Sequence, residues 1–250
     1  TKEDFIQYIK LGNIDMGMPA FGDKLSDSQI RTLQIYIEEI QQRKRREGKN
    51  LGGSLQKNKF KAGGYLFRLE TIIEDLDMPW SISFISIEKA LITERSGTLR
   101  VWENGILSKA VSGIPKSIKR GQGGLLEVAV HPEYNMNQWV YLAYSESLNT
   151  DEEKPATMTK VVRGRIVDGQ WCDQEDIFYT DEKYHSVSGV HYGTRFVFKD
   201  GYLFFGIGDR GKQDHAQDLT RPNGKIHRIH DDGRIPVDNP FLHIQNAYPS

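Results

Sequence analysis

The polar residues best suited to chemistry flank a short predicted hairpin. Residues 194–198 and 202–207 are β-branched and aromatic runs, and the Asp200-Gly201 turn between them is a strong signal for antiparallel pairing. Such pairing brings four polar side chains to one end of the hairpin: His191, Arg195, Asp209 and Arg210. An imidazole, a carboxylate and two guanidinium groups gathered in this way indicate a functional site.

The same stretch matches the dinucleotide fingerprint G-x-G-x-x-G at residues 206–211. That motif requires a following helix within a βαβ unit, because the helix N-terminus holds the pyrophosphate. Here a hairpin precedes the motif and the polar sequence KQDHAQDL follows it, without apolar periodicity. We therefore do not expect a nicotinamide cofactor.

The composition indicates a folded globular protein, with 250 residues, 38% of them hydrophobic and 27% charged. The formal net charge of −1 gives no reason to expect a nucleic-acid partner. The basic run at residues 43–46 is interpreted as a solvated linker, with a binding patch as the alternative.

Cys172 is the single cysteine, which excludes an internal disulfide and any multi-cysteine metal site within these residues. No run reaches the ~20 apolar residues needed to span a membrane, and no signal peptide is visible. Because the sequence starts without methionine, we expect a fragment of a longer protein, in which a missing signal is uninformative.

Residues 1–42 are predicted to be helical, with a loop at residues 12–21. Ser26 and Gln29 form a capping-box pattern ahead of apolar residues spaced by three and four. Those residues are Ile30, Leu33, Ile37 and Ile40.

The order of helix, Met-Pro-Ala-Phe loop and Leu-Ser-Asp-x-x-Ile helix resembles the C-terminal half of a class I cytochrome c. The resemblance implies that Met18, with Met16 as the second candidate, is the axial ligand of a haem iron. The alternative is a methionine that only fills space. The C-x-x-C-H attachment motif of haem c is absent, so we expect it upstream, and these residues alone cannot hold haem.

Residues 43–64 are predicted to be a linker, and residues 65–250 a second domain rich in short strands. Turn residues separate the strands, which favours an all-β sandwich, barrel or propeller, and the recurrence of strand pairs fits blades of ~40–50 residues. Strands are expected at 68–73, 80–85, 90–94, 98–102, 125–130, 139–145, 160–167 and 225–229, besides the hairpin.

A glycine cluster at residues 120–124 surrounds Gln122, just before a predicted buried strand. Glycines there would let the backbone approach a ligand closely, while the alternative is a tight turn between strands.

A series of motifs resembles the soluble quinoprotein glucose dehydrogenase and aldose sugar dehydrogenase family, in this order: MPWSISF, LITERSGTLRVW, RGQGGLLEVAVHPEY, HYGTRFVF, LFFGIGDRG, AQDL, GKIHRI and DGRIPVDNPF. The resemblance runs from about Leu69 to Phe241. It implies an all-β, six-bladed β-propeller, of which this chain holds a part. It also implies oxidation of an aldose C1 hydroxyl to the lactone with pyrroloquinoline quinone (PQQ), assisted by calcium.

The resemblance makes His191 the catalytic residue, acting as general base toward the C1 hydroxyl, a task suited to imidazole. It assigns Gln122, Arg195, Asp209 and Arg210 to cofactor binding. Val190 departs from the glucose dehydrogenase branch, which has an acid at this position, so glucose is not assigned as the substrate. Without its neighbours, His191 would be interpreted as a strand-end histidine bonded to backbone.

Together the two resemblances imply a quinoprotein sugar dehydrogenase whose electrons pass to a fused cytochrome c. Such enzymes are periplasmic or secreted. We expect the fragment to be inactive alone, because the remaining pocket and calcium residues of the family lie downstream. The alternative is a non-catalytic propeller that binds carbohydrate or protein, since a fold alone does not carry a function.

Overall fold

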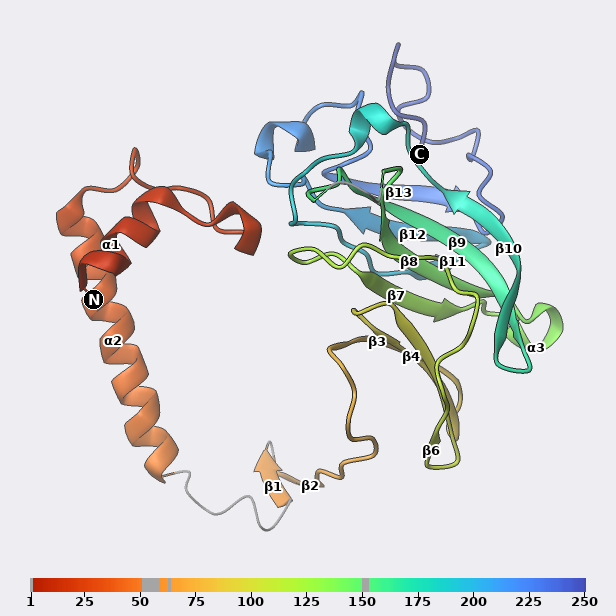
Figure 1. Cartoon of the computed structure of the whole chain (residues 1–250), viewed down its shortest axis with the longest axis horizontal. Coiled ribbons are helices and arrows are strands. Elements are labelled where there is room, and N and C mark those ends of the chain that lie inside the picture. Colours follow the sequence, from red (N-terminus) through yellow and green to blue (C-terminus); the bar gives the residue numbers. More distant parts are fainter. Residues whose placement is uncertain (1, 51–58, 63, 150–152) are drawn as a thin grey trace. The chain divides into compact units, whose positions relative to one another are not determined.

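The computed structural model describes residues 2–50, 59–62, 64–149 and 153–250, and these form two compact units. The smaller unit comprises residues 1–13 and 18–74, and the larger comprises residues 14–17 and 75–250. The units divide after Glu74, later than the boundary near residue 65 that the sequence predicts. The larger unit is mostly β-sheet (Figure 1).

Two helices form the core of the smaller unit, α1 (Lys2–Leu11) and α2 (Asp27–Asn50). The predicted capping box is confirmed: Ser26 N–H donates to Gln29 Oε1 at 2.9 Å, and Gln29 N–H donates to Ser26 Oγ at 3.3 Å. Ile30 is fully buried against α1, whereas Leu33, one turn later, is 38% exposed. The buried part of the predicted apolar stripe is therefore confined to its first turn.

The predicted end of the second helix near residue 42 is wrong, because α2 continues to Asn50. Its last residues are rich in Gln, Lys, Arg and Glu, which are good helix formers. A hairpin of β1 (Lys59–Ala62) and β2 (Tyr65–Arg68) follows, so the strand predicted at 68–73 is also misplaced. The remainder of the predicted linker, residues 51–58 and 63, lies outside the described residues.

Three antiparallel sheets follow one another along the described part of the larger unit: β3-β4-β5-β6, β7-β8-β9-β10 and β11-β12-β13. Each is a meander in which consecutive strands pair, as expected for an all-β domain (Figure 1). The bounds are β3 (Pro79–Ser86), β4 (Lys89–Glu94), β5 (Thr98–Glu103), β6 (Ile106–Leu107), β7 (Leu125–Val130), β8 (Val140–Glu146), β9 (Met158–Val167), β10 (Gln170–Phe178), β11 (Val197–Lys199), β12 (Tyr202–Ile207) and β13 (Lys225–His230).

The hydrophobic cores lie between neighbouring sheets. One core joins Leu91 and Leu99 of the first sheet to Leu125 and Leu142 of the second. The other joins Tyr141 of the second sheet to Phe205 of the third. Packing of successive sheets face to face is what a propeller requires, because each blade covers its neighbour.

Strand β10 was not predicted from the sequence. Most of its residues are exposed, it lies at the edge of its sheet, and its pairing with β9 shifts register between Cys172 and Glu175. A polar edge strand lacks the apolar alternation by which strands are recognised.

The hairpin β11–β12 is confirmed. Lys199 pairs with Tyr202 across the turn, and the two turn residues Asp200 and Gly201 have φ of 52° and 79°, as a type I′ turn demands. After β12 only a short 3-10 helix (Gln213–Ala216) forms, so the helix required by the dinucleotide fingerprint is missing here.

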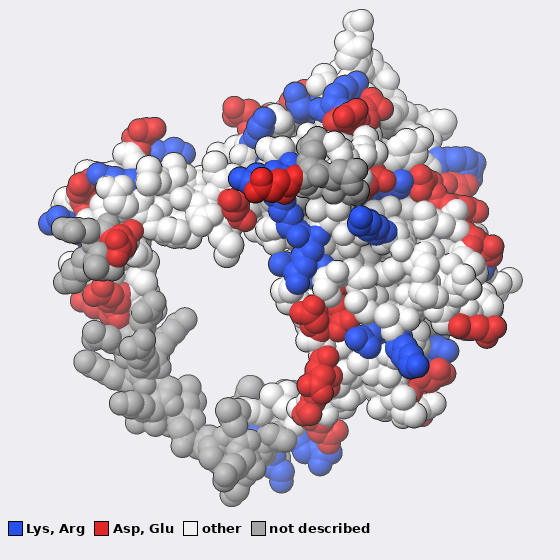
Figure 2. Space-filling model, viewed as in Figure 1, with Lys and Arg blue, Asp and Glu red and all other residues white. Residues whose placement is uncertain are grey.

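Acidic and basic side chains are interspersed over the viewed face of the larger unit, in agreement with the small net charge (Figure 2). No helix in the described parts of the chain is both long enough and apolar enough to cross a membrane.

Candidate functional site

The hairpin end holds a histidine–carboxylate pair. His191 Nδ1 lies 2.6 Å from Asp209 Oδ1, and Gly211 N–H donates to the same oxygen at 2.9 Å. An ionised carboxylate only accepts, so Nδ1 carries the proton, and in the neutral imidazole this leaves the lone pair on Nε2. The His191 side chain is 39% exposed.

Asp209 is ionised at neutral pH. Partial burial acts to raise its pKa, but the hydrogen bonds from His191 and from Gly211 N–H outweigh burial and hold the pKa below the ordinary value of 3.8. The carboxylate therefore keeps the imidazole in one tautomer and would stabilise the imidazolium that forms when Nε2 takes a proton.

Gln122 supports the same histidine from the backbone side. His191 N–H donates to Gln122 Oε1 at 2.8 Å, and Gln122 N–H donates to the Gly189 carbonyl at 2.7 Å. The amide oxygen is thus engaged by the backbone of His191.

The glycines around Gln122 serve close packing of the chain on itself. A Cβ on Gly121, whose φ is +54°, would lie 2.3 Å from the Gly189 carbonyl oxygen, and one on Gly124 would lie 2.1 Å from the Arg95 carbonyl oxygen. Gly123 N–H also donates to the Arg120 carbonyl at 2.8 Å, so the segment forms a turn, as the second of the two interpretations expects.

Arg195 lies at the same hairpin end but pairs with a residue the sequence did not single out. Its Nη1 donates to Glu127 Oε2 at 2.6 Å, with the arginine side chain 70% exposed and the glutamate 10% exposed. Burial raises the pKa of Glu127 above 4.5, although the Arg195 charge opposes this rise. Glu127 fixes one end of a guanidinium whose remaining donors face solvent.

Arg210 is buried, unlike His191, Arg195 and Asp209, the other polar residues predicted at this end of the hairpin. Its side chain is 2% exposed, and its guanidinium donates to the Val190 and Ser188 carbonyls, each at 2.5 Å. The cofactor-binding role predicted for Arg210 stays a prediction, and its contacts are all with the protein itself.

A cavity of about 640 Å³ opens beside this cluster. It is bordered by Arg195, Asp209, Lys225 and the half-buried indole of Trp80 from β3. Arg95 stacks on Trp80, with its guanidinium carbon 5.7 Å from the ring centroid. The cavity therefore combines cationic donors, a carboxylate and an aromatic wall, a set that suits a polar or acidic organic ligand.

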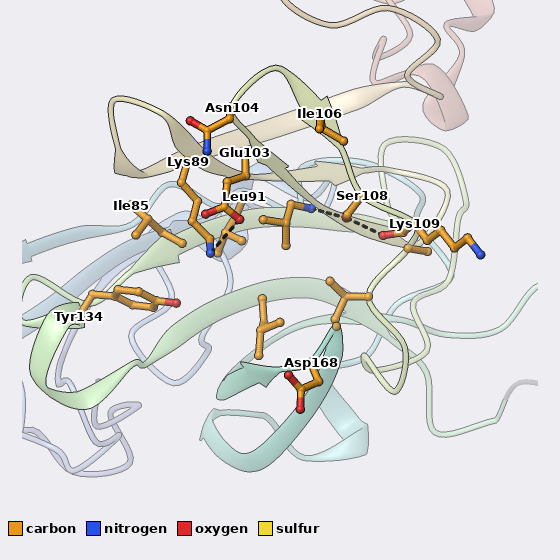
Figure 3. A pocket seen from close by; sticks show the side chains of 15 residues that line it. Ile85, Lys89, Leu91, Glu103, Asn104, Ile106, Ser108, Lys109, Tyr134 and Asp168 are labelled. Carbon is orange, nitrogen blue, oxygen red and sulfur yellow. Dashed lines mark hydrogen bonds and ion pairs between the residues drawn. The ribbon is translucent and has the colours of Figure 1, made fainter.

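A second cavity, of about 770 Å³, lies between β5 and the turn that joins β9 to β10 (Figure 3). Leu91 is among its apolar residues. Of its four charged residues, Lys89 and Glu103 pair with each other at 3.2 Å, and Lys109 and Asp168 are the other two. None of the predicted site residues borders it, so we do not assign the chemistry to this cavity.

The predicted metal ligand, Met18, lies in the smaller unit and packs against the cluster of Ile6, Ile9 and Ile30. All seven histidines lie at or after His131, so the smaller unit offers no imidazole to complete a haem iron site. Across the described residues, no group of three or more His, Cys, Asp or Glu side chains is arranged to hold a metal ion. The described residues therefore offer no cluster of imidazole, thiolate and carboxylate groups for a metal ion.

Sequence reasoning missed Glu127, Trp80, Tyr192 and Thr157 as contributors to this region. Trp80 and Glu127 both lie within the quoted motifs, in MPWSISF and GLLEVAV, but nothing local marks a strand residue as the partner of a distant arginine.

Successive antiparallel sheets with cores between them, and a histidine–aspartate pair between the loop before β11 and the end of β12, define a propeller-type protein with a polar site. The pattern of the Glucose / Sorbosone dehydrogenase family matches residues 76–250, and the chain belongs to that family.

The similarity to characterised relatives is substantial. The chain is 38% identical over 184 residues to an aldose sugar dehydrogenase of Escherichia coli, covering 72% of this chain and 48% of that protein. The crystal structure of the soluble aldose sugar dehydrogenase of Escherichia coli, in its apo-form, matches with a TM-score of 0.63 and 36% identity, covering 70% of this chain and 50% of that one.

A PQQ-bound aldose sugar dehydrogenase from Streptomyces coelicolor matches with a TM-score of 0.58 and 23% identity, covering 72% of this chain and 52% of that one. At this identity the likeness shows the fold alone. The chain spans about half the length of the relatives it matches.

Proposed function

We propose that this chain is part of a quinoprotein oxidoreductase that oxidises the C1 hydroxyl of an aldose to the lactone. The observation that carries the proposal is the His191–Asp209 pair at 2.6 Å in a member of the Glucose / Sorbosone dehydrogenase family. The name of the relative from Escherichia coli, an aldose sugar dehydrogenase, supports the same substrate class. The finer proposal of a six-bladed propeller follows the family resemblance.

His191 takes the hydroxyl proton in this proposal. Nε2 accepts the proton from the C1 hydroxyl as the carbon–oxygen single bond becomes a carbonyl, and Asp209 stabilises the resulting imidazolium. PQQ, when bound, would supply the acceptor for the hydride that leaves C1. Imidazole suits this task because it changes charge near neutral pH.

The donors present fit an acidic quinone. Arg195 presents an exposed guanidinium at the cavity. Gln122, which supports the His191 backbone, carries an amide NH2, and both kinds of donor bind carboxylates. We place PQQ binding on these two residues rather than on Arg210. Calcium, with ligands beyond the described residues, belongs to the proposal as a family property.

We further propose that the electrons leave through a fused cytochrome c, whose haem iron would be ligated by Met18, and that the protein is periplasmic or secreted. Tethering raises the effective concentration of the acceptor, so each electron would be removed without a diffusional encounter. The support for this part is the helix–loop–helix order around Met18, which the smaller unit contains.

The test uses the intact gene product, loaded with PQQ and calcium. We expect aldose-dependent reduction of an artificial electron acceptor, and PQQ binding measured by fluorescence titration that Arg195→Ala weakens by about 10-fold, the loss of one charge-assisted contact. A protein that binds sugar or a partner protein but reduces no acceptor with any aldose would instead be a binding module.

Asp209→Asn should lower kcat of the intact, PQQ-loaded protein by about 10²-fold, because the amide no longer stabilises the imidazolium. Steady-state kinetics measures the change. Asp231→Asn is the matched control: Asp231 also bonds a histidine, His131 at 3.0 Å, but away from the cavity, and it should leave kcat unchanged. Equal losses in both variants would contradict a catalytic role for the pair.

A further inference from the structure

Arg210 is a buried cation without an acidic partner. Among the described residues no carboxylate lies within ion-pairing distance of its guanidinium, and its Nε has no hydrogen-bond partner. Burial lowers the pKa of Arg210 from 12.5, and the Arg120 charge acts in the same direction. Burying an unpaired charge is costly, so a chain that does so gains something specific from it.

Its hydrogen bonds end on the backbone immediately before His191. The guanidinium donates to the carbonyls of Ser188 and Val190, at 2.5 Å each, and to the Thr157 hydroxyl at 3.2 Å. Charge-assisted bonds to two carbonyls of one loop fix that loop in a single conformation.

An aromatic ring and a hydroxyl lock the guanidinium in place. Its central carbon lies 3.5 Å from the centroid of the Tyr192 ring, and the Tyr192 hydroxyl bonds Thr157 Oγ1 at 2.7 Å. Residues 190 and 192, on either side of His191, are therefore both held by Arg210.

His191 itself has a φ of +55°, an uncommon conformation for a residue with a Cβ. Such a conformation persists only where the surroundings enforce it. Adjacent residues supply that enforcement: Asp209 bonds the imidazole, and Arg210 bonds the backbone on which the imidazole is carried.

We propose that Arg210 is a positioning residue, which holds the His191 loop so that the imidazole meets Asp209 and presents Nε2 to substrate. The expected effect of Arg210 on kcat rests on the proposed function, whereas its effect on the position of the His191 loop does not. The positioning role differs from a cofactor-binding role, because a guanidinium that is 2% exposed has no surface to offer a ligand.

The first experiment uses the cofactor-free intact protein with isotope-labelled histidine. The short bond between His191 Nδ1 and Asp209 gives a strongly deshielded proton resonance, which His191→Gln identifies by removing it. We expect Arg210→Lys and Arg210→Met to lose or broaden that resonance. Arg163→Met is the matched control, since Arg163 also stacks on an aromatic ring, Trp139, and donates to a carbonyl, and it should leave the resonance intact.

The second experiment uses the PQQ-loaded protein. Arg210→Lys should lower kcat by about 10²-fold, as expected for a misplaced catalytic group, with the PQQ Kd within about twofold of wild type. A weaker PQQ Kd with an unchanged histidine resonance would overturn the proposal in favour of cofactor binding, and so would an unchanged resonance with unchanged kcat.

Thr157→Val keeps the proposal falsifiable if the Arg210 variants do not fold. It removes one bond to the guanidinium and should broaden the same resonance and lower kcat several-fold, about the value of one hydrogen bond, without changing PQQ affinity. An unchanged resonance in Thr157→Val would then count against the proposal. If the wild-type protein oxidises no aldose, the proposed function fails, while the resonance still decides the positioning role.

Discussion

Replacing His191 with glutamine should lower kcat of the intact, PQQ-loaded protein by about 10³-fold while leaving PQQ affinity within a few-fold of wild type. Glutamine has no lone pair that can take the hydroxyl proton at neutral pH, and a positioned general base contributes about 10²–10⁴-fold. The affinity is preserved because Arg195 and Gln122, the proposed cofactor donors, keep their side chains.

The measurement is steady-state oxidation of an aldose together with fluorescence titration of PQQ. His230→Gln serves as the control, because His230 is also a partly exposed histidine. It lies at one end of β13, and Lys225, which borders the cavity, lies at the other end. It should retain wild-type kcat. A His191→Gln protein with wild-type kcat would remove the general base from the mechanism.

The hairpin and its polar end could be predicted because turn chemistry is local. Asp200 and Gly201 set the turn, the turn sets the register, and the register puts His191 and Asp209 at one end. The ladder itself ends at Val197, so the 2.6 Å contact also depends on the loop that carries His191.

The different position of Arg210 could not be predicted, because its burial depends on distant parts of the chain. Thr157, at the start of β9, and Tyr192 create its site, and neither is near it in sequence. In the same way Glu127 of β7 meets Arg195 only through the packing of sheets. A motif indicates that an arginine is present, whereas tertiary packing decides whether its charge faces a ligand or the protein's own carbonyls.

The edge strand β10 shows the same limit for secondary structure. Most of its residues are exposed and polar, so its sequence lacks the apolar alternation of a strand. It forms a strand because it pairs with β9. The predicted helix end near residue 42 failed for a different reason: the sequence after residue 42 has no apolar periodicity, but it is rich in good helix formers, and α2 continues to Asn50.

His227 should make the larger unit less stable in acid. It is fully buried, with Nε2 2.7 Å from the Pro222 carbonyl and Nδ1 2.8 Å from Ser250 Oγ, and its ring stacks on Phe205. Burial lowers its pKa from 6.5 to about 4, although the Pro222 and Ser250 bonds act in the opposite direction.

The direction in which the free energy of unfolding changes with pH follows from the two pKa values of His227, in the folded and in the unfolded protein. Above pH 6.5 the imidazole is neutral in both the folded and the unfolded protein, so its contribution does not change with pH. Between 6.5 and about 4 the unfolded protein binds a proton that the folded protein excludes, so the free energy of unfolding falls. Below about 4 both states bind the proton, and the loss stops.

The gap of about 2.5 between the two pKa values corresponds to about 3 kcal/mol of unfolding free energy lost from pH 7 to pH 4. Urea unfolding at a series of pH values measures it, by comparing wild type with His227→Phe, whose ring keeps the stacking but cannot titrate. The variant should lose about 3 kcal/mol less than wild type over that range, whatever its stability at pH 7. As a control, His243→Gln removes an exposed histidine and should follow the wild-type curve. If the curves of wild type and His227→Phe ran parallel, burial would not keep His227 neutral.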